Sequence, residues 1–414
     1  MKHLTRLFHP QGRTRRGPRL RPLAARAASS LRLLACAIAL GTLCACHSSE
    51  EPEPKPTEQT ILFYFPWSGN DTPSGGYNNL YNIFLSNIAE IKRAITERQT
   101  MANARLIVCL ASERDQATLT EVVMKRTGVT QDTLKTYTGV DFTQAETIRQ
   151  IISDAKAQAP AERYALMIGC HGMGWIPRQE EATNRQEVRR RYFGGLVSKF
   201  QTDIKTLVQA IEQTQTHMDF ILFDDCYMAN VEVAYDLRGV TDFLIASTSE
   251  IMARGLPYDR MWNHLSPNPN YAMAVQEFLD YYLTYTYPYG TLSAIDCREA
   301  EAMATLMREA NYRHTLDPTE ADQIQRLDGY TPTIFFDMGD YIDHLCEGDD
   351  QLLDQLHAQL QRLVPHTAAT PYIYSVFTSR PIHLETFSGI TISDPTTSNS
   401  AHRKEQTDWW QATH

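Results

Sequence analysis

Between residues 60 and 250 the chain alternates short apolar runs with amphipathic segments, and this alternation constrains its fold more than any other feature. The five runs are short and continuous, as expected of strands that are buried on both faces of a parallel sheet. They are TILFYFPW (60–67), ARLIVCLAS (104–112), RYALMIGC (163–170), DFILFDD (219–225) and DFLIAST (242–248). Amphipathic segments lie between them, near residues 77–98, 142–157, 201–216 and 228–238. The pattern predicts an α/β domain over residues 60–262, with a mainly parallel sheet flanked by helices.

The pattern is looser after residue 262, where we expect a smaller C-terminal α+β region over residues 263–414. Helices are predicted near 272–285, 298–313 and 339–363, and strand-like segments at GTLSAIDC (290–297) and SGITISD (388–394). The aromatic cluster DYYLTYTYPYG (280–290) is typical of core and interface packing, and a stacking surface is the alternative.

The first 45 residues are typical of a signal peptide, with nine Lys and Arg, no Asp or Glu, and an apolar run from Leu33 to Ala45. That run is shorter than the roughly 20 residues a spanning helix needs. Its end, LCAC, resembles a bacterial lipobox, which makes Cys46 the expected site of lipidation and the mature N-terminus. The alternative is an ordinary secretory signal with a chance cysteine.

Residues 46–59 are rich in Ser, Glu and Pro and are expected to form a flexible linker. Acidic residues just after a lipidated cysteine resemble the surface-export tags of Bacteroides-type lipoproteins. We therefore expect an outer membrane lipoprotein that faces the periplasm or the cell surface and contacts the membrane through its lipid anchor.

The charge of the chain argues against nucleic acid as a partner. Removal of the leader takes away nine of 39 Lys and Arg and none of 49 Asp and Glu, which leaves a net charge of about −19. A body of this charge repels nucleic acid and anionic membrane surfaces, and it weakly favours cationic substrates.

Two of the strand-like runs end on residues that can perform nucleophilic catalysis. His171 follows one run directly, Cys226 follows another, and ligands of open α/β sheets bind outside the carboxyl ends of the strands. A neighbouring imidazole or a helix N-terminus lowers the pKa of a thiol, and a helix is expected to begin right after Cys226. Gly172 and Gly174 allow a sharp turn, and the amides of Gly172 and Cys226 are candidate donors to an oxyanion.

Other sites have little support in the sequence. The five cysteines beyond Cys46 are widely spaced, with no CxxC pair for zinc or redox chemistry. Asp224 and Asp225 could hold a divalent cation, but no third ligand is apparent, so we expect no catalytic metal and no cofactor for the chemistry. The chain has no GxxxxGK[ST], HExxH or GxSxG motif.

The segments GCHGMGW and LFDDCYM resemble the two catalytic motifs of the clostripain-like cysteine peptidases, which are relatives of caspases, legumain and gingipains. The similarity extends through YFPWSGN (64–70), VEVAYDL (231–237), DFLIASTSEIMARGLPYD (242–259) and FSGITISDP (387–395). The resemblance implies a caspase-like fold and peptidase activity. It makes Cys226 the nucleophile, His171 the general base and acid, and the Gly172 and Cys226 amides the oxyanion hole.

The resemblance also implies polypeptide substrates with Arg or Lys before the cleaved bond. Asp224 matches the acidic position of the family's specificity pocket, and Glu250 is a second candidate for substrate binding. Asp225 departs from the family, where many members have Ala, and its charge is expected to affect the thiol pKa or the pocket. The likeness leaves a structural calcium ion open.

The polar segment between the two motifs is a candidate for self-cleavage, because the resemblance implies activation by a cut there. Arg178, Arg185 and Arg191 are the candidate positions within 178–191, and a merely solvated loop is the alternative. For the whole chain, the alternative function is a catalytically idle caspase-like lipoprotein that binds peptides or surface proteins.

Overall fold

Nine strands form one sheet in the computed structural model, which describes residues 56–66, 80–176, 193–195 and 200–414. Their order is β13-β11-β10-β9-β5-β1-β2-β3-β4. In chain order the strands are β1 (Gln59–Phe65), β2 (Ala104–Glu113), β3 (Gln116–Lys125), β4 (Gly128–Thr138), β5 (Arg163–Gly169), β9 (Met218–Asp224), β10 (Thr241–Ala246), β11 (Thr291–Asp296) and β13 (His366–Ala369). The five central strands, which are β2, β1, β5, β9 and β10 in sheet order, are parallel. Antiparallel strands extend the sheet at both edges. The predicted α/β fold with a mainly parallel sheet is confirmed.

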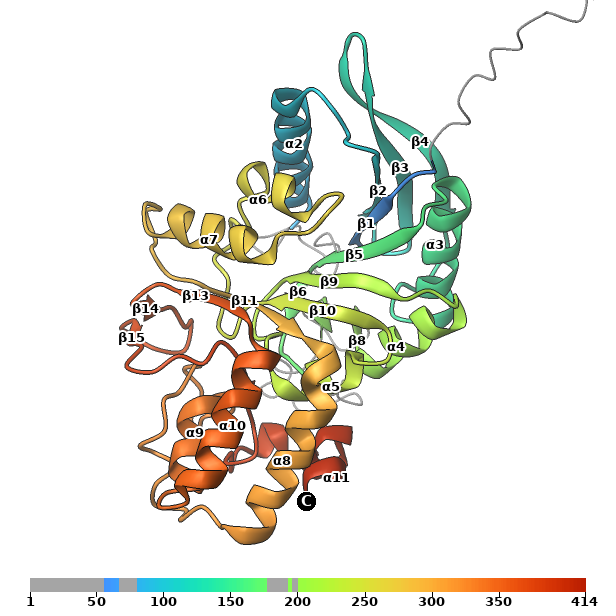
Figure 1. Cartoon of the computed structure of the whole chain (residues 1–414). Helices are drawn as coiled ribbons and strands as arrows, with labels where there is room; N and C mark the ends of the chain where they lie inside the picture. The colour runs from blue at the N-terminus through green and yellow to red at the C-terminus, as the bar shows by residue number, and fades with distance from the viewer. Residues whose placement is uncertain (1–55, 67–79, 177–192, 196–199) are drawn as a thin grey trace, which may run out of the picture. The chain divides into compact units, whose positions relative to one another are not determined.

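Helices cover both faces of the sheet (Figure 1). One face packs against α2 (Tyr81–Arg98), α6 (Tyr258–Leu265) and α7 (Tyr271–Tyr282), and the other against α3 (Ala145–Gln158), α4 (Ile204–Gln213) and α5 (Val231–Leu237). Side chains of β1 alternate between the two cores, with Phe63 in one and Tyr64 in the other. This double burial explains why the central strands are continuous apolar runs in the sequence.

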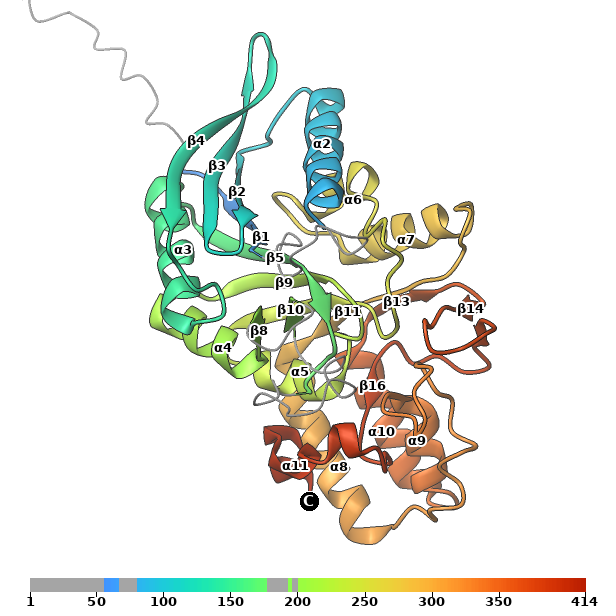
Figure 2. The ribbon, with the colours of Figure 1, turned by 180° about the vertical axis from the view of Figure 1, so that it is seen from behind.

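The last third of the chain adds helices and short strand pairs. Figures 1 and 2 both show α8 (Ala300–Arg313), α9 (Met338–Leu345), α10 (Asp350–Leu363) and α11 (Asp408–Thr413) gathered together. Short strands form the pairs β12 (Phe336–Asp337) with β16 (Thr391–Ile392), and β14 (Tyr372–Ile373) with β15 (Ile382–His383). The helical segment expected at 339–363 contains two helices, and the turn between them includes Gly348 at φ +83°.

Residues 56–414 form one compact unit. The strands β11 and β13, which follow residue 262 in the chain, extend the same sheet as β10. The division of the chain at residue 262 stays a prediction. No helix among the described residues is both long and apolar enough to cross a bilayer.

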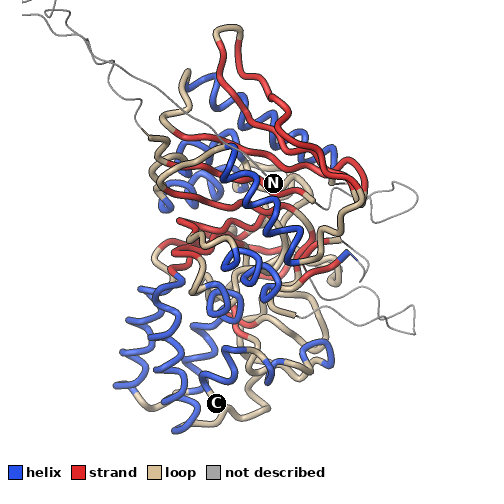
Figure 3. Tube along the Cα trace, turned by 90° about the vertical axis from the view of Figure 1, so that its right-hand side faces the viewer, coloured by secondary structure: helices blue, strands red, loops and turns tan. Residues whose placement is uncertain are grey.

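The hairpin of β3 and β4 has no counterpart among the sequence predictions. It reaches beyond the other strands at the top of Figures 1 and 3. Most residues of β4 are partly exposed, so the strand carries polar side chains instead of a continuous apolar run. Edge strands of this kind escape a search for buried strands.

Candidate functional site

The site is built at the ends of two neighbouring parallel strands. Gly169, the last residue of β5, lies opposite Asp224, the last residue of β9. His171 and Cys226 each follow two residues later, and both side chains are half-buried. The sheet therefore brings the segments that carry the imidazole and the thiol to the same end of the sheet, where the sequence predicted that they meet.

Gly172 lies directly against the Cys226 segment. A β carbon at Gly172 would be 2.5 Å from the Cys226 carbonyl oxygen and 2.8 Å from the Asp225 carboxyl group. His171 and Gly172 form β6 (His171–Gly172), which pairs with β7 (Phe193–Gly194) in a small sheet completed by β8 (Gln201–Thr202). Only a glycine lets this segment approach so closely.

A second glycine turns the chain after the histidine. Gly174 has φ +63°, a conformation that disfavours side chains, and a β carbon there would be 2.5 Å from the Asn230 amide nitrogen. Asn230 donates a hydrogen bond of 2.6 Å to the Tyr227 carbonyl oxygen. The turn expected after His171 is therefore packed against the turn that follows Cys226.

Cys226 begins a tight turn at the end of β9. Tyr227 has φ +62°, and its N–H donates to the Ser249 carbonyl oxygen at 3.1 Å. The Ile251 N–H points at the Cys226 Sγ, with an N···S distance of 3.4 Å. The thiol thus lies between the end of β9 and the segment that follows β10.

Buried hydroxyl groups hold this second segment in place. Ser247, Thr248 and Ser249 are fully buried, and all three side chains bond to the Thr291 hydroxyl at 2.8 to 3.3 Å. Thr291 belongs to β11, so the antiparallel edge of the sheet supports the segment that faces the thiol. These polar residues are satisfied by one another, which allows their burial.

The electrostatic surroundings of Cys226 differ from the sequence prediction. Burial raises the pKa of its thiol well above the usual range, and the carboxyl groups of Glu250, Asp225 and Asp224 raise it further, against a lowering by the Ile251 N–H. The expected helix does not begin right after the cysteine. The helix α5 begins at Val231 after an Asn230 cap, because the left-handed turn at Tyr227 intervenes.

Asp224 is buried beside the thiol segment and is satisfied by the chain itself. Its carboxylate accepts hydrogen bonds from the Tyr258 hydroxyl at 2.9 Å and the Leu256 N–H at 3.2 Å. Gly255, at φ +72°, passes so close that a β carbon there would be 2.7 Å from the carboxylate. Burial raises the pKa of Asp224 to about 6, and the two hydrogen bonds oppose this rise.

Asp225 contacts a different cysteine. Its carboxylate oxygen is 3.1 Å from the Cys170 Sγ, and both side chains are buried. Burial raises the pKa of Asp225 well above its usual range, and the nearby Asp224 adds to this rise. The carboxyl group of Asp225 therefore favours its neutral form.

Glu250 connects the turn at Tyr227 to the loop between β14 and β15. Its carboxylate accepts hydrogen bonds from the Tyr227 hydroxyl at 2.8 Å, the Ser375 hydroxyl at 2.8 Å and the Val376 N–H at 3.0 Å. In this structure Glu250 binds the chain's own groups. Its role toward substrate stays a prediction.

Several predicted site residues lie outside the described residues, namely Cys46, Arg178, Arg185 and Arg191. The described cysteines are Cys109, Cys170, Cys226, Cys297 and Cys346; all are free, and Cys226 is the one that is not fully buried. No group of three or more His, Cys, Asp or Glu in the described part of the chain is placed to hold a metal ion. The calcium ion stays a prediction.

Sequence patterns missed the partners that position the site. Tyr258 and Leu256 bind Asp224 from 34 and 32 residues further along the chain, and Ile251 reaches Cys226 from 25 residues further. Nothing in the local sequence indicates that the hydroxyl of Tyr258 binds a carboxylate. Only the folding of the segment after β10 over the end of β9 creates these contacts.

Comparisons with known proteins point to one family. A family model described as the clostripain family matches residues 75–333. A secreted C11 cysteine protease from Bacteroides thetaiotaomicron, called iotapain, is 43% identical with a TM-score of 0.80, over 87% of this chain and 100% of its own. A clostripain from the same species, solved with the peptide inhibitor BTN-VLTK-AOMK, is 48% identical with a TM-score of 0.53, over 54% of this chain and 99% of its own. No curated protein matches.

Proposed function

Because this chain belongs to the clostripain family and is a cysteine peptidase, we propose that it is an endopeptidase that cleaves after Arg or Lys. Cys226 is the nucleophile and His171 is the proton carrier. The observation that carries the proposal is that the strands before these two residues end side by side, with Gly169 opposite Asp224.

In the proposed mechanism the Cys226 sulfur attacks the carbonyl carbon of the substrate while His171 takes the thiol proton. The amides of Gly172 and Cys226 donate to the resulting oxyanion. His171 then gives its proton to the leaving amine, and a thioester forms. Attack by water on the thioester releases the acid product and restores the thiol.

Asp224 is proposed to select the basic side chain. Its burial supports this role, because a carboxylate with few solvent contacts gains strongly from a cation that enters the site. The clostripain from Bacteroides thetaiotaomicron was solved with an inhibitor whose peptide part is VLTK, which agrees with a basic residue at the cleaved bond.

Self-cleavage is the proposed route to activation. Burial and the carboxyl groups of Glu250, Asp225 and Asp224 raise the pKa of the Cys226 thiol, and this disfavours the thiolate. We propose that cleavage between residues 178 and 191, after Arg178, Arg185 or Arg191, changes these surroundings and activates the enzyme.

The protein is further proposed to be an outer membrane lipoprotein anchored through Cys46. The lipobox-like LCAC and the acidic linker support this location. Labelling of the wild-type protein with a radioactive fatty acid, and its loss in Cys46→Ser, would support the anchor. An unlabelled wild-type protein recovered from the medium would contradict it.

The decisive experiment compares hydrolysis of fluorogenic peptides that end in Arg or Lys. Wild type is expected to cleave them, Cys226→Ala to be inactive, and Cys346→Ala, which removes a buried thiol after α9, to keep activity. Self-cleavage predicts two bands on a denaturing gel for the wild type and one band for Cys226→Ala. Activity confined to peptides ending in Ala or Asp would contradict the role of Asp224.

A further inference from the structure

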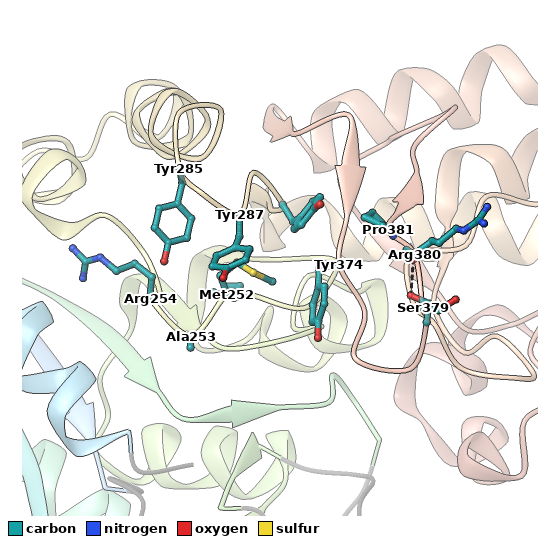
Figure 4. A pocket seen from close by; sticks show the side chains of 12 residues that line it. Met252, Ala253, Arg254, Tyr285, Tyr287, Tyr374, Ser379, Arg380 and Pro381 are labelled. Carbon is teal, nitrogen blue, oxygen red and sulfur yellow. Dashed lines mark hydrogen bonds between the residues drawn. The ribbon is translucent and has the colours of Figure 1, made fainter. Parts of the chain in front are cut away.

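A pocket of about 550 Å³ opens beside residues 251–254, which follow β10, and it has no role in the mechanism above. Four of its lining residues are tyrosines, Tyr285, Tyr287, Tyr289 and Tyr374. Figure 4 shows Tyr285, Tyr287 and Tyr374 in a row, with Arg254 near one end and Arg380 near the other. We call it the tyrosine pocket. A pocket lined by aromatic side chains is a type of site that binds an apolar or aromatic group.

The tyrosine pocket borders the proposed catalytic centre through Ile251. Its wall includes residues 251–254, and the first of these, Ile251, points its N–H at the Cys226 sulfur. Gly255, the next residue along the same segment, covers Asp224. When the basic side chain of a peptide reaches Asp224, a neighbouring residue of that peptide is therefore within reach of the tyrosine pocket.

Contacts among the tyrosines hold the pocket in shape. The rings of Tyr281 and Tyr285 are stacked with centroids 5.4 Å apart, and those of Tyr289 and Tyr374 with centroids 6.4 Å apart. The Tyr282 hydroxyl also donates to the Gly255 carbonyl oxygen at 2.9 Å. A site that is formed before the ligand arrives loses less conformational entropy on binding.

The loop that carries Tyr374 is also fixed, because Glu250 accepts hydrogen bonds from Ser375 and Val376 just after it. Tyr374 is still 36% exposed and Tyr287 is 58% exposed, so their rings are open to a ligand. Exposed aromatic side chains that are held in place are typical of binding surfaces.

The charges of the pocket disfavour a basic ligand. Among the described residues that line it, two are Arg and none is Asp or Glu. Arg254 pairs with the buried Glu90, and Arg380 is exposed on the rim. A second cationic side chain in this pocket would meet the Arg380 guanidinium without a carboxylate to balance it.

We propose that the tyrosine pocket is a second specificity site, which binds an aromatic side chain of the substrate on the N-terminal side of the cleaved bond. It excludes Lys and Arg there. The inference rests on the proposed function, since it assumes that Asp224 takes the basic residue before that bond. The enzyme then reads two features of its substrate, a basic residue and a nearby aromatic residue.

The test uses the full mature chain and internally quenched peptides with a fixed Lys. Phe, Ala, Glu or Lys is placed in turn at each of the three positions before this Lys and the two positions after it. We expect Phe to raise kcat/KM over Ala by about tenfold or more at one position before the Lys, mainly through KM, because ring contacts and apolar burial add to binding. Lys at that position should lower it.

Variants connect this preference to the pocket. The double variant Tyr285→Ala/Tyr374→Ala should lose the preference for Phe and keep the hydrolysis of the Ala peptide. The control Tyr312→Ala removes a 91% exposed ring from α8 and should keep the preference. Arg380→Glu should raise the hydrolysis of the peptide with a second Lys.

Failure of the pocket is distinguishable from failure of the peptidase. Active enzyme with no preference for Phe, or with a preference confined to the C-terminal side, would overturn the inference and leave the proposed function intact. If no peptide is hydrolysed, calorimetry on Cys226→Ala still compares the Phe and Ala peptides. Equal affinity for the two would then also overturn it.

Discussion

Gly172→Ala tests the central geometry of the site. A β carbon at this position would lie 2.5 Å from the Cys226 carbonyl oxygen, whereas ordinary contact begins at 3.4 Å. The two strand ends must therefore separate by about 0.9 Å. The neighbouring atom is backbone at the end of a buried strand, so it has no flexible side chain that could move aside.

A misplacement of about 1 Å can lower the rate of an enzyme by about 100-fold, so we expect a loss of this order in kcat/KM. The steric cost to folding is of order 1–3 kcal/mol, which a domain of this size tolerates. The fluorogenic lysine peptide measures the activity, and circular dichroism measures the unfolding temperature.

Gly239→Ala is the matched control, because a β carbon at Gly239 would have no atom within 4 Å. It should retain wild-type kcat/KM. The reasoning is refuted if Gly172→Ala folds and cleaves as fast as the control, since the two segments would then not need their close approach.

Three other predictions follow from the surroundings of the site and of α5. The kcat/KM for lysine peptides should rise as pH increases through about 6, where Asp224 loses its proton, and Asp224→Asn should lose most activity and this rise together. An identical pH profile in the variant would exclude Asp224 as the titrating group. Glu250→Gln should lower the pKa of Cys226 by removing a nearby negative charge, so that iodoacetamide alkylates the thiol faster at pH 8; an unchanged rate would contradict this electrostatic effect. Burial raises the pKa of Glu232 to about 8, above the 4.5 of an exposed carboxyl, so the stability from its neutral form is complete below pH 4.5 and is lost as pH rises through 8. Glu232→Gln should therefore raise Tm by a few degrees at pH 8 and little at pH 4.5, whereas the exposed Glu97→Gln should change it at neither pH.

The sequence by itself determined the parallel centre of the sheet. The central strands are buried on both faces, so their apolar runs are visible without any knowledge of their partners. Two of these runs end next to His171 and Cys226, and the sequence predicted that the two ends meet, because the carboxyl ends of parallel strands lie at the same end of a sheet. The β3–β4 hairpin could not be found in this way, since its strands bury only scattered side chains, such as Leu119 and Val122, and contain no continuous apolar run.

Only the tertiary structure decided how the site residues are surrounded. The helix after Cys226 was expected to lower the thiol pKa, but the turn at Tyr227 delays that helix, and burial with Glu250 raises the pKa. The tyrosine pocket likewise joins side chains from residues 285–289 and 374, which are distant in the chain. Solvent exclusion and contacts between distant segments set both properties, and neither leaves a periodic signal in the local sequence.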